Sequence, residues 1–295
     1  MKCFYHSADL DGHCSGAIIK MVYPDCKMIG INYGDDFPWK SLPVGCGEKV
    51  FMVDFSLQPY PLMRKLAIHA DPLIWIDHHK SAIEECWEFG DSYLGIQRSG
   101  IGACQLVWEY LKEEGHFYSE DFQTISTEQM LPTFVKLLAE YDVWNHTDPR
   151  TLPFQYGIRQ YDTSPENQDF WEELLNPHSI KVEQLIIEGE LIIKYENSQN
   201  EKYCSACAFD TELDGLKCIA VNKMLTNSRV FDSVWNPNKY HAMLTFGYRK
   251  GQWTVSLYST REDIDVSAIA KARGGGGHKG ASGFQCKELP FILGV

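Results

Sequence analysis

The stretch Pro72-Leu73-Ile74-Trp75-Ile76 is followed directly by Asp77-His78-His79-Lys80. The first five residues form a short apolar run, which is typical of a parallel strand buried on both faces. An aspartate and two histidines at the end of such a strand are costly to remove from water unless a partner neutralises them, and a metal ion would be such a partner. Asp77 could instead cap a helix while both histidines face solvent, and the triplet alone leaves both interpretations open.

Strands and helices alternate on both sides of this stretch. Strands are predicted over 2–5, 27–32, 49–53 and 72–76, and helices over 13–23 and 59–70. This alternation predicts an α/β domain with a doubly wound, mostly parallel sheet. Ligands of such sheets bind beyond the carboxyl ends of the strands. Since three of the predicted strands end in acids or in acid and histidine, we expect these polar groups on one rim.

The pattern changes in the second half of the chain. Helices are predicted over 102–112 and 130–144, a loop-rich stretch with four prolines over 145–177, and a helix over 179–195. Strand-like segments then follow over 216–222, 240–248 and 252–258, with a helix over 266–271. We therefore expect a metal-binding catalytic domain at 1–178, a linker helix at 179–203, and a smaller α/β substrate-binding domain at 204–295 across a cleft.

Composition narrows the classes of function. A formal net charge of -13 argues against a sequence-independent grip on long duplex nucleic acid. No apolar run approaches the ~20 residues of a membrane span, and the first residues lack a signal-peptide core. The ten cysteines have no regular spacing, and the close pair Cys204 and Cys207 is a weak zinc signal. We expect a soluble cytoplasmic protein with reduced thiols and no membrane partner.

Six side chains form the candidate metal site. They are His6, Asp9, Asp11, Asp54, His78 and Asp142. Carboxylates mixed with imidazoles suit Mn²⁺ and, less well, Mg²⁺. The set is too large for one open catalytic ion and suits two, as in-line attack on phosphorus requires. Each residue also has an ordinary alternative: Asp9 and Asp11 could be turn residues, and Asp142 a surface acid on its helix. The argument for a site is their expected convergence.

A second candidate element is Arg273-Gly274-Gly275-Gly276-Gly277-His278-Lys279. Successive glycine N–H groups can approach an anion closely, and the flanking basic residues add positive charge. In so acidic a chain this pattern indicates a phosphate or carboxylate pocket, although a flexible loop is the simpler alternative. The run lacks the Gly-Lys-Ser/Thr ending of a phosphate-binding loop of the Walker type, and it does not begin a βαβ unit as a dinucleotide fingerprint would.

With these residues assembled, the chain resembles the DHH phosphoesterase superfamily, in the branch with a C-terminal DHHA1 domain. The similarity lies in five segments in the expected order: His6 to Gly12, Val53-Asp54, Asp77-His78-His79, Asp142, and the glycine-rich Gly274 to Phe284. The resemblance implies a manganese-dependent phosphodiesterase or phosphatase. Its substrates would be short single-stranded oligonucleotides, cyclic or linear dinucleotides, or nucleoside bisphosphates.

The resemblance also implies roles for single residues. One Mn²⁺ would be held by His6, Asp9 and Asp54. The other would be held by Asp11, Asp54, His78 and Asp142, with Asp54 bridging. His79 would stabilise or protonate the departing oxygen, and Asp77 would orient the histidine pair. The substrate would be bound by Gly274–Gly277 and His278, with Arg273 beside them.

Two details depart from the family pattern. Only Ser7 and Ala8 separate His6 from Asp9, where many relatives have three residues, and Tyr258 stands where many have an arginine. A family II-type inorganic pyrophosphatase and a non-catalytic nucleotide-binding member are the alternatives. The glycine-rich C-terminal segment argues against the first, and the complete set of motif acids argues against the second. The nucleotide used, the polarity of any exonuclease activity, the metal in the cell and the oligomeric state, with a homodimer as one option, stay open.

Overall fold

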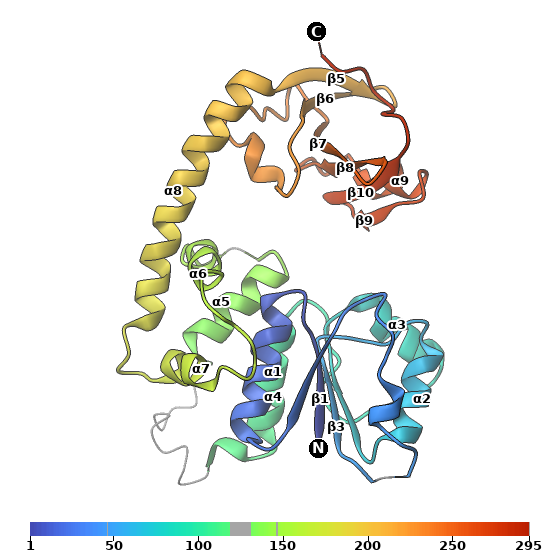
Figure 1. The fold of residues 1–295 in the computed structure, drawn as a ribbon, viewed down its shortest axis with the longest axis vertical. Helices are drawn as coiled ribbons and strands as arrows, with labels where there is room; N and C mark the ends of the chain where they lie inside the picture. The colour runs from blue at the N-terminus through green and yellow to red at the C-terminus, as the bar shows by residue number, and fades with distance from the viewer. Residues whose placement is uncertain (46, 119–130, 146, 295) are drawn as a thin grey trace. The chain divides into compact units, whose positions relative to one another are not determined.

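The computed structural model describes residues 1–45, 47–118, 131–145 and 147–294. The chain divides into two compact units, Met1–Ile192 and Ile193–Val295 (Figure 1). Each unit has its own sheet and its own apolar core. None of the helices in these described ranges combines the length and the apolar character that crossing a membrane requires.

A four-stranded parallel sheet forms the centre of the first unit, in the order β2-β1-β3-β4. The strands are β1 (Lys2–His6), β2 (Lys27–Ile31), β3 (Val50–Val53) and β4 (Leu73–Ile76). Every residue of β3 and β4 is buried, which explains why these strands are continuously apolar in sequence. The register pairs Tyr5 with Val53 and Val53 with Ile76, so that three strands end at the same rim.

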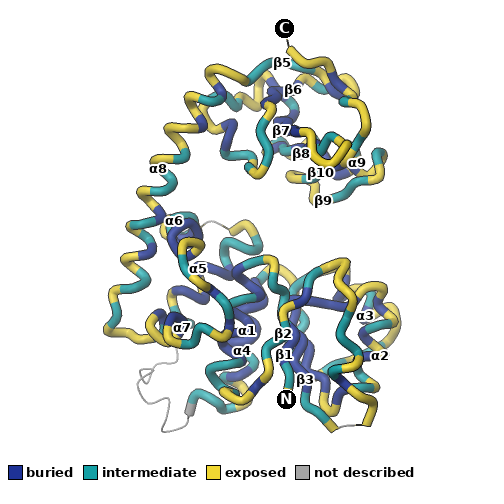
Figure 2. Tube along the Cα trace, viewed as in Figure 1, coloured by how far each residue is buried: buried dark blue, intermediate teal, exposed yellow. Residues whose placement is uncertain are grey.

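Helices cover both faces of this sheet, which confirms the expected doubly wound α/β fold (Figure 1). One core contains residues of α1 (Leu10–Val22), α4 (Ala103–Glu113) and α5 (Thr133–Asp142). The core on the opposite face contains residues of α2 (Pro61–His69) and α3 (Lys80–Glu88). Strands β3 and β4 and the inner sides of these helices are buried, whereas the edge strand β2 is mostly intermediate or exposed (Figure 2).

The prediction that residues 145–177 form mainly loops was wrong. This stretch contains two helices, α6 (Thr151–Ile158) and α7 (Gln168–Leu175). Pro153 is the third residue of α6, where a missing N–H costs no intrahelical hydrogen bond. The buried side chains of Phe154 and Trp171 hold both helices against the core of the first unit.

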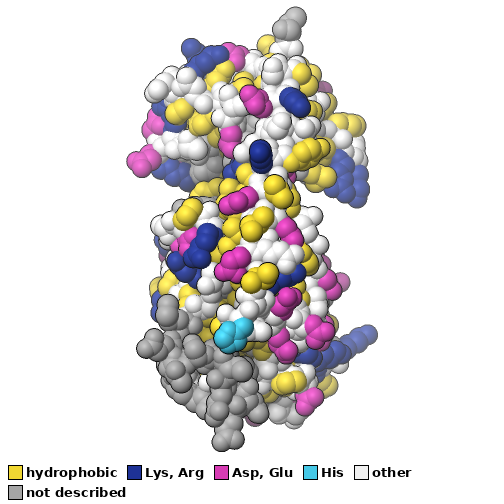
Figure 3. Space-filling model, turned by 90° about the vertical axis from the view of Figure 1, so that its left-hand side faces the viewer, with side chains coloured by type: hydrophobic (Ala, Val, Ile, Leu, Met, Phe, Trp, Pro, Cys, Tyr) yellow, Lys and Arg dark blue, Asp and Glu magenta, His cyan; other side chains and the backbone are white. Residues whose placement is uncertain are grey.

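The long helix α8 (Lys181–Cys207) begins in the first unit and ends in the second. It continues well beyond the stretch 179–195 that helical periodicity indicated, and it contains most of the expected linker at 179–203. Its exposed side chains include Ile187, Leu191 and Tyr195. On the side of the molecule turned to the viewer in Figure 3, apolar side chains lie among acidic and basic ones.

The second unit is built on a six-stranded mixed sheet in the order β5-β6-β7-β8-β10-β9. Its elements are β5 (Phe209–Leu213), β6 (Leu216–Val221), β7 (Ala242–Arg249), β8 (Gln252–Tyr258), α9 (Val266–Lys271), β9 (Gly276–His278) and β10 (Ala281–Cys286). The bounds of β8 and α9 are those expected from the sequence, whereas β5 and β10 were not anticipated. Part of the glycine run is the edge strand β9, paired antiparallel with β10, so it is not simply a loop.

Candidate metal centre

Every residue of the candidate metal site lies at the end of an element in the first unit. His6 is the last residue of β1, Asp9 is the N-cap of α1, and Asp11 lies in the first turn of that helix. Asp54 directly follows β3. The triplet Asp77-His78-His79 follows β4, and Asp142 is the last residue of α5. The parallel sheet and the helices packed on it therefore deliver side chains from distant parts of the chain to one rim.

The first group of potential metal ligands is formed by His6, Asp9 and Asp54. The Nδ1 atom of His6 lies 2.8 Å from Oδ2 of Asp9 and 3.6 Å from Oδ2 of Asp54. The other carboxylate oxygen of Asp9 accepts a hydrogen bond from the N–H of Gly12 at 2.9 Å, as an N-cap residue does. Asp9 thus caps the helix with one oxygen and faces the site with the other.

The second group is formed by Asp11, His78 and Asp142. The Nε2 atom of His78 lies 3.1 Å from Oδ2 of Asp142, 3.3 Å from Oδ1 of Asp54 and 3.8 Å from Oδ2 of Asp11. Asp54 therefore contacts both groups, one carboxylate oxygen towards each histidine. A third group, Asp54, His78 and His79, shares Asp54 and His78 with these two, so the six side chains of the candidate site lie close together, with His79 beside them.

The environment of Asp54 differs sharply from that of Asp11. Asp54 is 1% exposed, and neither of its carboxylate oxygens accepts a hydrogen bond from the described residues. Asp11, by contrast, accepts hydrogen bonds from the N–H groups of Ala103 at 2.6 Å and Cys104 at 2.8 Å, at the N-terminus of α4. A buried carboxylate without donors is destabilising. Because its neighbours are oxygen and imidazole ligands, the centre fits divalent cations.

The crowded charges shift the protonation of these groups. Burial and the charge of Asp11 raise the pKa of Asp54 well above its usual value. The same two causes, burial first, raise the pKa of Asp142 to about 7. Burial opposes the charge of His6, but the nearby carboxylates of Asp54 and Asp9 outweigh burial and raise the pKa of His6 to about 10. Cations at this centre would displace protons, because ligands must be deprotonated to coordinate.

Two curated proteins are similar to this chain in sequence, whereas no family model matches it. It is 26% identical over 265 residues to the uncharacterized protein R106 of Acanthamoeba polyphaga mimivirus, covering 83% of this chain and 55% of R106, about half of that relative's length. It is 24% identical, over an alignment of 327 positions, to the oligoribonuclease NrnB of Bacillus subtilis, covering 99% of this chain and 75% of NrnB.

Two solved structures share the fold. A pGpG-specific phosphodiesterase, PggH from Vibrio cholerae, superposes with a TM-score of 0.56 at 13% identity, covering 96% of this chain and 92% of that one. An exopolyphosphatase-related protein from Bacteroides fragilis gives a TM-score of 0.51 at 14% identity, covering 98% and 87%. In its fold, its relatives and the order of its motifs, the chain thus resembles the DHH phosphoesterase superfamily.

The Asp77-His78-His79 triplet of this chain is held together by the carboxylate of Asp77. Its buried Oδ1 accepts hydrogen bonds from the N–H groups of His78 at 2.7 Å and His79 at 3.2 Å, and lies 2.7 Å from Nδ1 of the His79 ring. Helix α3 does begin directly after this turn. His78 nevertheless faces the acids, with an 11% exposed side chain, while the His79 side chain is 34% exposed. The triplet thus starts a helix and contributes to the centre.

Sequence reasoning missed three side chains around the candidate centre, namely Tyr33, His13 and Arg159. The ring of Tyr33 lies 5.7 Å from that of His6 and 6.4 Å from that of His79. A cavity of about 290 Å³ beside Asp9 is lined by His13 and Arg159, among others. Tyr33 follows β2 at the same rim, so the rule about strand ends could have found it. Arg159 directly follows α6, in the stretch that we expected to be loops.

The glycine motif of the second unit has a clear packing role at one position. A Cβ built on Gly275 would overlap the carbonyl oxygen of Gly283 and the side chain of Phe284, whereas one built on Gly276 would meet no heavy atom within 4 Å. Arg273 lies 2.7 Å from Oδ1 of Asp214, so its charge is already paired within this unit. These residues belong to the second unit, and the metal residues to the first.

The cysteine pair at the end of α8 gains no support as a zinc site. Cys204 is buried and its Sγ donates to the carbonyl oxygen of Val230 at 3.0 Å, while Cys207 is exposed. Within the described ranges, the groups of side chains that could hold a metal contain no cysteine.

Proposed function

We propose that this protein is a manganese-dependent phosphoesterase that hydrolyses phosphodiester or phosphomonoester bonds of small nucleotide substrates, namely short oligonucleotides, dinucleotides or nucleoside bisphosphates. The observation that carries the proposal is the buried, unsatisfied carboxylate of Asp54 between two groups of carboxylate and imidazole ligands. The names of NrnB, an oligoribonuclease, and PggH, a pGpG-specific phosphodiesterase, support small nucleotides as the substrate class.

The proposal assigns each ligand to one of two cations. His6, Asp9 and Asp54 would hold one, and Asp11, Asp54, His78 and Asp142 the other. The donor atoms are carboxylate oxygens and imidazole nitrogens, which suit Mn²⁺ and accept Mg²⁺. Cations bound here would make a water molecule acidic and stabilise the charge on the phosphoryl oxygens.

His79 is the residue that we propose for proton delivery to the departing oxygen. Burial opposes its positive charge, but the hydrogen bond from Nδ1 to Asp77 outweighs burial and raises the pKa of His79. The ring is thereby oriented and its protonated form is favoured, and its other nitrogen, Nε2, is left for the substrate. Asp77 acts through His79 and is a positioning residue.

The distribution of charge between the two units supports a requirement for bound cations. The first unit contains 30 acidic and 14 basic residues, a net charge of −16, whereas the second contains 10 and 13, a net charge of +3. An anionic substrate is therefore repelled by the catalytic unit unless bound cations offset the local acids. The Gly274–Gly277 run, with His278, is proposed to contribute to substrate binding, which suits its position in the more basic unit.

The test is turnover of a linear dinucleotide and of a nucleoside 3′,5′-bisphosphate in Mn²⁺ and in EDTA. We expect metal-dependent release of mononucleotide or phosphate by the wild type and the exposed-site control Asp36→Ala, and loss by at least about 10³-fold in Asp54→Ala. Absence of metal-dependent turnover of both substrates would overturn the proposal. Rapid cleavage of pyrophosphate with both nucleotides inert would instead identify a pyrophosphatase.

A further inference from the structure

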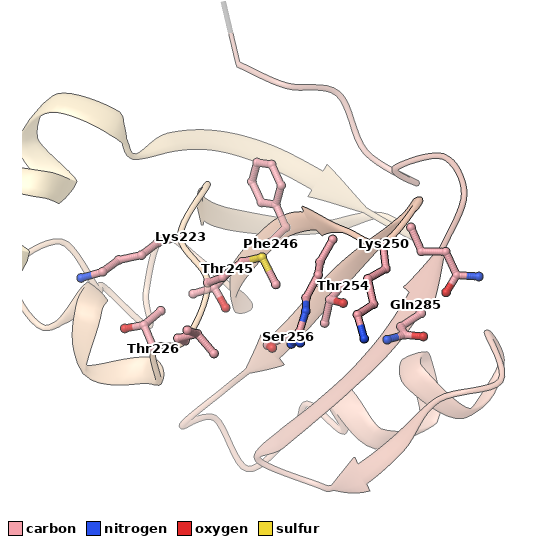
Figure 4. Close-up of a pocket in the computed structure, with 12 residues that line it drawn as sticks. Lys223, Thr226, Thr245, Phe246, Lys250, Thr254, Ser256 and Gln285 are labelled. Atoms are coloured by element: carbon pink, nitrogen blue, oxygen red, sulfur yellow. The ribbon is translucent and has the colours of Figure 1, made fainter.

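A cavity of about 620 Å³ lies on the sheet of the second unit, within the size range of small-molecule sites (Figure 4). Its floor follows from the alternation of β8: Thr254 and Ser256 face the cavity, while Val255 and Leu257 point into the core. Gln285 pairs with Thr254 in the sheet and adds an amide to the same face. Figure 4 shows these side chains on one side of the sheet, with Phe246 turned to the other.

The polar side chains that line this cavity favour an anionic ligand. It contains hydroxyl and amide groups and three cationic side chains, Lys223, Arg249 and Lys250, but neither Asp nor Glu. Hydroxyls, amides and cations can all donate hydrogen bonds to phosphate oxygens. In a chain of net charge −13, a cavity with this lining selects negatively charged ligands.

Two of the cations are free to bind a ligand. In the same unit Lys239, Arg261 and Arg273 each pair with an aspartate. The side chains of Arg249 and Lys250, which line the cavity, have no hydrogen bond or ion pair with any described residue. Lys223 donates to the amide oxygen of Asn200 at 2.7 Å, so it is held in place without losing its charge.

The backbone holds Lys250 at the tip of a two-residue hairpin between β7 and β8. Its φ is 51° and that of Gly251 is 82°, values that favour Asn-Gly or Gly-Gly at these positions. A lysine here adopts an unfavoured conformation while its side chain lines the cavity. Met224 packs over Gly247 and forms one wall with Leu225, which is 99% exposed. This wall offers an apolar surface for a flat ring.

We propose that this cavity binds a nucleoside monophosphate, with the phosphate between Arg249, Lys250 and the Thr254 hydroxyl, and the base against Met224 and Leu225. The site is distinct from the glycine motif: none of its lining residues lies within 273–278, and β9 pairs with the first three residues of β10, whereas Gln285 lies near its end. The proposal requires neither metal nor catalysis, so it does not depend on the proposed activity.

The experiment is calorimetric titration of the whole chain in EDTA with AMP, adenosine and inorganic phosphate. We expect AMP to bind at least about tenfold more tightly than adenosine, since the phosphate contacts are charge-assisted. R249A/K250A should weaken AMP binding by at least about tenfold, and Thr254→Val, which keeps every charge, by severalfold. The control K194A/K202A removes two exposed lysines of α8 and should change the dissociation constant less than about twofold.

Three outcomes would overturn the site. One is the absence of AMP binding to the wild type. Another is an equal loss in the hairpin and α8 double variants, which would indicate unspecific attraction. A third is loss of binding in Asp54→Asn, which would place the ligand in the metal centre. Circular dichroism of each variant checks the fold, which we expect to be retained because the substituted hairpin residues are exposed.

Discussion

Among the single side chains, Asp54 combines the greatest electrostatic cost with the central position in the metal centre. Its carboxylate is buried without donors, and its backbone has a φ of 54°, a conformation that aspartate and asparagine tolerate better than most residues. Asp54→Asn should therefore fold, and without metal it should be more stable than the wild type because one repelling acid is removed. The free-energy cost of burying this carboxylate would be offset by a bound cation.

The first prediction concerns the melting temperature of Asp54→Asn. In EDTA it should rise by a few degrees, since roughly 1 kcal/mol corresponds to about 2–4 °C for a domain of this size. The rise on adding Mn²⁺, which we expect for the wild type from linkage, should be lost. Differential scanning calorimetry of both proteins, with Asp36→Asn as an exposed control, makes the measurement. A normal Mn²⁺ response in Asp54→Asn would contradict the bridging role.

The second prediction separates positioning from ligation at the DHH motif. Asp77→Asn keeps the size of the side chain but weakens its hold on Nδ1 of His79. We expect kcat to fall about 10–100-fold, as is typical for a residue that orients another, with KM and Mn²⁺ affinity nearly unchanged. The pH profile of kcat should also move to lower pH, since the interaction that raises the pKa of His79 is weakened. Unchanged kcat with reduced metal affinity would argue for a purely structural role.

Among the helices, α1 depends on a close approach to β1. A Cβ built on Gly12 would overlap the carbonyl oxygen of His6, so any larger residue must push the start of α1 away from the end of that strand. Gly12→Ala should therefore cost about 1–3 kcal/mol and reduce Mn²⁺ affinity, since Asp9 and Asp11 lie between His6 and Gly12 in the chain. Urea unfolding and Mn²⁺ titration test both effects. Wild-type behaviour in both measurements would show that the contact is not needed.

The turn that leads into α6 carries a prediction about pH. Hydrogen bonds from Arg150 hold the pKa of Asp148 below its usual value. A carboxylate whose pKa is lowered by folding contributes stability above its unfolded pKa of about 4, and this is lost as the pH falls through the folded value. Asp148→Asn should therefore lower the melting temperature at pH 7 by an amount that shrinks below about pH 4.

The effect of Asp148→Asn should be small, under about 1 kcal/mol, because Arg150 is about half exposed. Thermal melts of wild type and variant between pH 3 and pH 7 provide the comparison, with the exposed Asp25→Asn as a control. A difference that grows as the pH falls would contradict the assigned interaction.

These elements also show where sequence reasoning succeeds. Asp54 and the triplet Asp77-His78-His79 each directly follow an apolar run, so a local pattern was enough to place them at the end of a strand. Asp142 had no such signal, because its position depends on how α5 packs against the sheet, and only the family resemblance pointed to it. Arg159 was missed because prolines suggested loops where Pro153 lies within the first turn of a helix.

At the scale of the whole molecule, the two units carry net charges of opposite sign. The first unit, with a net charge of −16, contains the acidic centre, and the second, with +3, contains the glycine motif and the basic cavity. This distribution of charge favours cation binding in the first unit and anion binding in the second. Whether a substrate uses both units can be tested by substitutions in the second unit that leave its fold unchanged.

Gly276 is the best position for that test. A Cβ there meets no heavy atom within 4 Å and its backbone is not left-handed, so Gly276→Ala should fold normally. If the glycine run approaches a nucleotide closely, the added methyl group should raise KM for a dinucleotide at least about tenfold. The rate with bis(4-nitrophenyl) phosphate, which lacks nucleoside groups, should change little. Equal kinetics of wild type and Gly276→Ala on the dinucleotide would remove the glycine run from the substrate site, while leaving the metal centre as proposed.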